Sequence, residues 1–124
     1  MRRSMMQVFV SGSAEALEFY KKAFNAEIKC AYPDDRGRMM HAELNVNGQI
    51  LAVMELPDGQ EPVTGNTMMF CLHFGAGMED EARRIYGVLS EGAREASPLD
   101  ENCGYSPLQF VLTDKYGVWW CIFV

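Results

Sequence analysis

The sequence lacks long apolar runs and an excess of positive charge. No stretch approaches the ~20 consecutive apolar residues of a membrane-spanning helix, and the two arginines near the start precede no apolar signal segment. There are 11 Lys and Arg against 17 Asp and Glu, for a formal net charge of −6, so the chain offers no basic field to attract phosphates. We therefore expect a soluble, cytoplasmic protein with neither a membrane nor nucleic acid as a partner.

Two further motifs are missing. The four cysteines, Cys30, Cys71, Cys103 and Cys121, form no C-x-x-C pair, which argues against a zinc knuckle or a thiol redox motif and favours free thiols. No glycine-rich loop of the kind that binds an adenosyl cofactor follows the first predicted strand, so a methyltransferase finds no support.

What is present is the composition of one folded domain. The chain has 124 residues, of which 48% are apolar and 23% charged, enough to bury a core and too few residues for a separate cofactor lobe.

The first half predicts a strand over 5–11 and then an amphipathic helix. Ser13 is the expected N-cap and Asn25 the expected stop, and the apolar residues between them recur at helical spacing. Turn-forming residues then separate three more predicted strands, at 28–32, 39–46 and 49–56.

The second half repeats this order. It predicts a strand over 67–74, a helix from about Met78 that ends before Gly92, and strands at 94–97, 107–113 and 117–124. The whole is an α+β fold of two tandem βαβββ modules in a single domain. Module one spans about 5–56, the Pro- and Gly-rich linker 57–66, and module two about 67–124.

The loop around Asn47-Gly48 decides which side chains share a face of the sheet. A two-residue loop would set Glu55 opposite Met40 on the apolar face, where an unpaired carboxylate costs several kcal/mol. We therefore predict a three-residue loop, 46–48, which pairs Met39 with Glu55. In that register His41, Glu43 and Glu55 share a half-polar face that points away from the helix.

The same alternation assigns faces on the other strands. On the last strand both sets of alternating residues are apolar, so parity alone leaves the choice open there. The resulting candidates for the lining of a pocket are Gln7, Phe9, Met39, His41, Glu43, Val53, Glu55, Met69, Cys71, Trp119, Cys121 and Phe123.

Three stretches of sequence carry a family resemblance. They are the predicted helical segment from Ser13 to Tyr20, the predicted strand segment Met40-His41-Ala42-Glu43-Leu44, and the C-terminal segment from Leu112 to Trp120. Together with the tandem order they resemble the vicinal oxygen chelate superfamily, in particular the PhnB-like branch of the glyoxalase/bleomycin resistance/dioxygenase proteins. The resemblance implies a curved mixed-sheet cup that holds a small-molecule ligand, often with a divalent metal, in a homodimer.

The resemblance also implies where metal ligands would lie. The family positions fall on Met5, on Glu55, near 67–69 and on Cys121, and only Glu55 matches a usual ligand; His41 is a further possible one. The usual set is therefore incomplete, and catalytic residues stay unassigned. A histidine beside a carboxylate can act as a base or metal ligand, although His41 can equally be a packed strand residue. Cys121 can be a thiolate ligand or an inert small apolar residue.

Two functions remain open. One is a binding protein for a small or cationic aromatic compound, which the acidic charge and the Met and aromatic residues suit. The alternative is a metal-dependent enzyme of the superfamily, such as a glyoxalase-like lyase, an isomerase or a ring-cleaving dioxygenase.

Overall fold

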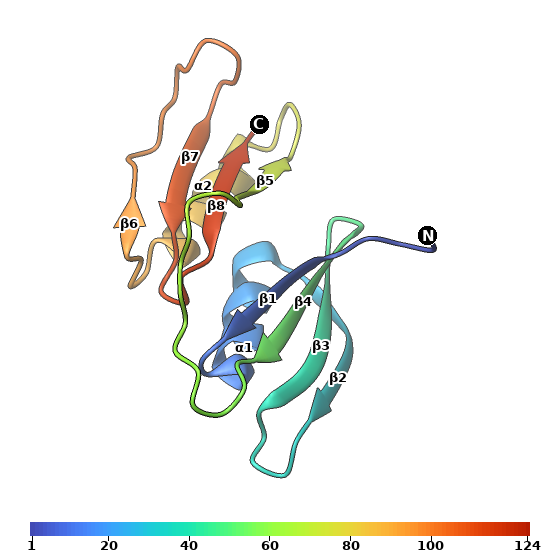
Figure 1. The fold of residues 1–124 in the computed structure, drawn as a ribbon. Helices are drawn as coiled ribbons and strands as arrows, with labels where there is room; N and C mark the ends of the chain where they lie inside the picture. Colours follow the sequence, from blue (N-terminus) through green and yellow to red (C-terminus); the bar gives the residue numbers. More distant parts are fainter. The chain divides into compact units, whose positions relative to one another are not determined.

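The structure is a computed structural model and describes residues 1–124. The chain divides into two compact units, Met1–Pro62 and Val63–Val124. Each unit holds one helix and a four-stranded mixed sheet (Figure 1), which confirms the predicted α+β class and the tandem βαβββ order. Neither helix is long and apolar enough to span a membrane.

The first unit has strand order β1-β4-β3-β2, with β1 parallel to β4 and the other neighbours antiparallel. Helix α1 packs on β1, β3 and β4. The elements are β1 (Met6–Val10), α1 (Ser13–Phe24), β2 (Glu27–Pro33), β3 (Met39–Val46) and β4 (Gln49–Glu55).

Helix α1 forms where its apolar periodicity predicts. Its buried face includes Leu17 and Tyr20, and Asn25 ends it in the left-handed conformation at φ 47°. The prediction that Ser13 is the N-cap is wrong: Gly12 occupies that position, and no side-chain cap bond comes from either residue. Ser13 Oγ instead accepts a hydrogen bond from the backbone N–H of Met39 at 2.7 Å, which ties the start of the helix to the start of β3.

The loop between β3 and β4 differs from its prediction. Val46 pairs with Gln49, so only Asn47 and Gly48 form the loop, and both have positive φ (49° and 88°), as a type I′ turn requires. Residues directly opposite in an antiparallel pair point to the same side, so Leu44 and Leu51 share the face that α1 covers.

The second unit has strand order β5-β8-β7-β6, with β5 parallel to β8. The elements are β5 (Phe70–His73), α2 (Glu79–Leu89), β6 (Glu95–Ala96), β7 (Gln109–Thr113) and β8 (Trp119–Phe123). Strands β5 and β6 are shorter than predicted, and residues 67–69 before β5 are exposed.

The contacts of Asp114 show which side chains of β8 face the core, a choice that the sequence left open. Its buried carboxylate accepts the N–H groups of Tyr116 and Val118 and, at 2.9 Å, the indole Nε1–H of Trp120. Trp120 is thereby held in the core, on the side of the sheet where Phe110 contacts Tyr86 of α2. Trp119 and Cys121, which lie on either side of Trp120 in β8, point to the opposite face.

Candidate functional site

Four of the predicted site residues lie on the face of the first sheet that α1 leaves uncovered. We call this the helix-free face of the first sheet. His41 and Glu43 project from β3, and Gln7 and Phe9 from β1. Phe9 is 47% exposed, so an apolar ring is accessible beside polar side chains.

Glu43 is the most strongly held ionisable group on this face. Its side chain is buried, and Arg3 binds both carboxylate oxygens, with Nη2 at 2.7 Å from Oε1 and Nη1 at 2.9 Å from Oε2. His41 Nε2 lies 2.9 Å from the same Oε1. The hydrogen bonds from Arg3 and then His41 lower the pKa of Glu43 to about 2, so the carboxylate is ionised at neutral pH.

A bulge in β2 brings Cys30 to this cluster. Ile28 pairs with Leu44 and Cys30 with Glu43, so Lys29 is the extra residue. In a regular strand Lys29 would lie opposite Glu43; the bulge places the thiol there instead. One ligand atom from each of Cys30, His41 and Glu43 lies within 4.8 Å of the others.

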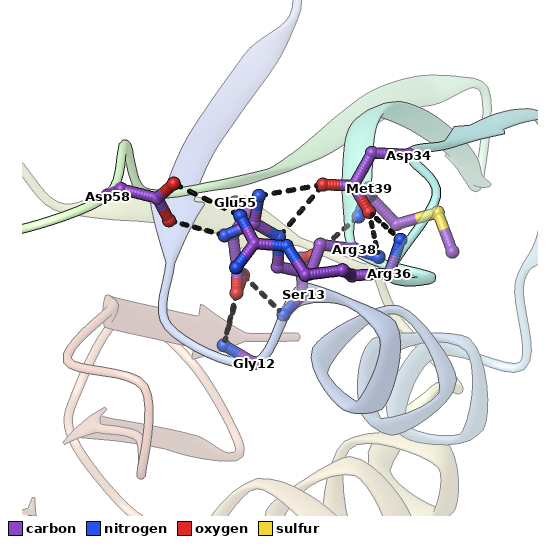
Figure 2. A network of polar contacts seen from close by, with 8 residues as sticks. All are labelled: Gly12, Ser13, Asp34, Arg36, Arg38, Met39, Glu55 and Asp58. Carbon is purple, nitrogen blue, oxygen red and sulfur yellow. Dashed lines mark hydrogen bonds and ion pairs between the residues drawn. The ribbon is translucent and has the colours of Figure 1, made fainter.

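The prediction that Glu55 and Val53 share a face with His41 is wrong. The two-residue loop places both on the side of α1, where Val53 is fully buried. The carboxylate of Glu55 is not unpaired there, because it accepts the backbone N–H groups of Gly12 (3.0 Å) and Ser13 (2.8 Å) at the start of the helix (Figure 2). Those N–H groups are the helix's own unsatisfied donors, so Glu55 acts as the cap that Ser13 was expected to provide.

A network of ion pairs surrounds this cap. Arg38 donates to Asp34 and Asp58, and Arg36 donates to Asp58, as Figure 2 shows. The small pocket beside these groups measures about 150 Å³. Every charged group in it is already engaged, because Arg38 pairs with Asp34 and Asp58 while Glu55 accepts backbone N–H groups, so the network joins the β2–β3 turn to the segment after β4.

The second sheet also has a helix-free face, and several half-buried or exposed rings lie on it. Trp119, Cys121 and Phe123 project there from β8, with Cys71 and His73 beside them on β5. The imidazole of His73 stacks on Phe123, with ring centroids 4.4 Å apart and planes 5° apart. Tyr105 meets Phe123 edge-on at 6.3 Å and donates its hydroxyl hydrogen to Gln109 Oε1.

A pocket of about 420 Å³ lies at the Trp119 end of this face. Thr113 and Trp119 line it from a directly opposed strand pair, and Arg94 and Glu95 line it from the adjoining segment. Arg94 also donates to Thr64 Oγ1 at 3.2 Å. The pocket thus combines one indole ring with a small number of hydrogen-bonding groups.

Cys121 has the environment of a structural thiol. It is buried, and burial together with the neighbouring Cys71 thiol raises its pKa to about 11. A thiol with that pKa stays protonated at neutral pH and is a poor nucleophile. Cys71, its partner in the strand pair, is exposed.

Two candidates remain, Met39 and Met69. Met39 begins β3 beside the cap network, and Met69 precedes β5. The sequence did not indicate Arg3, because its partner Glu43 is 40 residues away in the chain. It did not indicate Cys30, because no glycine or proline marks the bulge that places this thiol opposite Glu43. It also missed Tyr105, whose spacing from Phe123 carries no periodic signal.

A family model described as "Glyoxalase/Bleomycin resistance protein/Dioxygenase superfamily" matches residues 3–122. Among solved structures, the PhnB protein from Bacillus cereus superposes with a TM-score of 0.81 at 23% identity, covering 98% of both chains. A Pseudomonas aeruginosa protein gives 0.80 at 20% identity, covering 99% of this chain and 97% of that one. No curated protein matches the sequence.

A mutant of the fosfomycin resistance protein FosX from Listeria monocytogenes, complexed with Mn(II) and a dihydroxypropylphosphonic acid, gives a TM-score of 0.69 at 16% identity, covering 98% of this chain and 90% of that one. The family positions in this chain do not fit such a metal. Met5 has no strong donor, Cys121 is a buried protonated thiol, and Glu55 is engaged in capping α1 on the covered side of its sheet.

Proposed function

Because the chain belongs to the Glyoxalase/Bleomycin resistance protein/Dioxygenase superfamily, we propose that it binds a small planar aromatic molecule on the helix-free face of the second sheet. The observation that carries the proposal is the set of accessible rings on that face. His73 and Phe123 already stack in parallel, and Trp119 lines a pocket of about 420 Å³ on the same side of β8.

Stacked rings bind planar molecules through offset or edge contacts worth about 0.5–1.5 kcal/mol per pair beyond the area they bury. Trp119 and Phe123 are four residues apart on one strand, which spaces them by roughly 13 Å. A tricyclic ligand covers more of this distance than a bicyclic one, so a tricyclic ring system is the better fit between the pocket and the His73–Phe123 stack. The net charge of −6 favours a neutral or cationic ligand over an anionic one.

Binding is favoured over metal-dependent catalysis by the donor chemistry of the chain. The thiol at the family's last metal position is buried and protonated, and the carboxylate on β4 is held by α1. The proposal therefore includes no lyase, isomerase or dioxygenase step.

We further infer that the protein acts in the cytoplasm as a homodimer. All four cysteines are free thiols, as in proteins of reducing compartments. Large apolar side chains are exposed, including Phe9, Tyr32 and Met40. Light scattering on the purified chain measures the oligomeric state directly.

The binding test uses proflavine, a planar aromatic cation, and anthracene carboxylate, a planar anion. We expect proflavine to raise the melting temperature and to quench tryptophan fluorescence, and the anion to do so less. Because Trp120 is buried against Asp114, the quenched ring is Trp119, and the quenching is lost in Trp119→Phe.

The Phe123→Leu variant should bind proflavine about three- to tenfold more weakly. Tyr32→Leu is the matched control, because it removes an exposed ring from β2 in the other unit. The proposal is refuted if neither probe shifts the melting temperature or the fluorescence, or if the two variants bind proflavine equally.

A further inference from the structure

The cluster of Cys30, His41 and Glu43 in the first unit is separate from the ligand surface proposed above. It combines a thiol, an imidazole and a carboxylate, whose ligand atoms all lie within 4.8 Å of one another. None of the three occupies a position of the family's usual metal ligands. We propose that these side chains form a site for one zinc-type divalent cation, and that Arg3 occupies the place of that cation when it is absent.

The backbone is arranged to bring the three donors together. His41 and Glu43 are two residues apart on β3, so their side chains project to the same face. The bulge between Ile28 and Cys30 then sets the thiol directly opposite Glu43. Bulges commonly re-aim side chains in this way beside functional sites.

The donor set selects the metal. Thiolate sulfur and imidazole nitrogen are the ligands that Zn²⁺ prefers, while Mg²⁺ and Ca²⁺ bind sets composed of oxygen. Three protein ligands leave one tetrahedral position for water or another small ligand. On binding, the Cys30 thiol gives its proton to the buffer, and the proton that Nε2 of His41 donates to Glu43 leaves that nitrogen, so that the neutral imidazole carries its single proton on Nδ1 and Nε2 can bind the metal.

Charge explains the role of Arg3. A Zn²⁺ ion with one thiolate and one carboxylate is neutral overall, so the buried Glu43 keeps a compensating cation in both states. In the structure that cation is the guanidinium of Arg3, which binds both oxygens of Glu43. Arg3 lies on residues 1–5, which precede β1 without regular structure, and its side chain is 55% exposed. It can therefore leave without disturbing the sheet.

The test is a titration of the EDTA-treated full chain with Co²⁺ under reducing conditions, followed by competition with Zn²⁺. We expect one equivalent of Co²⁺ to produce a near-ultraviolet thiolate-to-cobalt charge-transfer band and visible bands of tetrahedral intensity, and Zn²⁺ to abolish both. Cys30→Ser should lose the charge-transfer band. Cys71→Ser, which removes an exposed thiol from the second unit, should keep it.

The Arg3→Met variant tests whether Arg3 competes with the metal ion for Glu43 or only supports the structure of the site. Without the guanidinium, Co²⁺ and Zn²⁺ should bind about tenfold more tightly, since one charge-assisted pair no longer has to be broken. The proposal is overturned if one equivalent of Co²⁺ gives no charge-transfer band, if the band persists in Cys30→Ser, or if Arg3→Met leaves metal affinity unchanged or weaker. Because the test uses the metal alone, its outcome is independent of proflavine binding.

Discussion

The cap that Glu55 provides for α1 can be tested by removing it. Glu55→Ala deletes the acceptor of two backbone N–H groups, those of Gly12 and Ser13, at distances of 3.0 and 2.8 Å. Glu55→Gln keeps an oxygen acceptor but removes the negative charge from the positive end of the helix dipole. Comparison of the two variants therefore separates the hydrogen bonds from the charge.

The expected magnitude follows from the contacts. Loss of a capping side chain costs about 1 kcal/mol, and loss of a carboxylate at a helix N-terminus costs about 0.3–1 kcal/mol more. We expect Glu55→Ala to lower the free energy of unfolding by about 1.3–2 kcal/mol and Glu55→Gln, which loses only the charge, by about 0.3–1 kcal/mol. For a chain of this size, the alanine variant should melt roughly 6 °C lower.

Urea denaturation monitored by circular dichroism measures both variants. Glu61→Ala is the control, since it removes an exposed carboxylate from the segment after β4. If Glu55→Ala unfolds at the same urea concentration as Glu61→Ala, the cap assignment is wrong. If Glu55→Ala loses proflavine binding while its stability is unchanged, Glu55 instead lines a ligand site, as the sequence predicted.

Two further predictions concern buried carboxylates. The folded-state pKa of Glu43 is lowered from 4.5 to about 2, so its ion pair stabilises the fold at neutral pH, and this stability is lost as the pH falls from about 5 through about 2. Urea midpoints across this range should fall less steeply in Arg3→Met; equal slopes would contradict the pairing. Asp114→Ala leaves three buried or half-buried N–H donors without their acceptor and should cost about 3 kcal/mol. Urea denaturation measures this loss, and a near-ultraviolet circular dichroism change reports the released Trp120; an unchanged midpoint and spectrum would refute the role of Asp114.

The order of elements and the bounds of several could be read directly from the sequence. The strand at 39–46 and the stop of α1 at Asn25 occur where predicted, because both depend on residues adjacent in the chain: an alternating pattern in one case and a residue tolerant of positive φ in the other. The family resemblance also depends on short sequence segments, and the family model confirms it.

The register of the β3–β4 hairpin shows where such reasoning fails. The Asn47-Gly48 pair is itself a strong signal for a two-residue turn. The prediction of a three-residue loop overrides that signal because the two-residue turn puts Glu55 on the covered face, where the sequence by itself shows no partner for a carboxylate. Its partners, Gly12 and Ser13, are more than 40 residues away in the chain, and only the packing of α1 on β4 brings them together.

Local sequence therefore determined the helices, the strands and the family, because hydrophobic periodicity and turn chemistry act between neighbouring residues. Tertiary structure alone decided which polar groups meet. Arg3 reaches Glu43 across 40 residues, and a bulge aims Cys30 at the same carboxylate. The free energy of a buried charge depends on the partners that the fold supplies, and these partners are not encoded beside it in the chain.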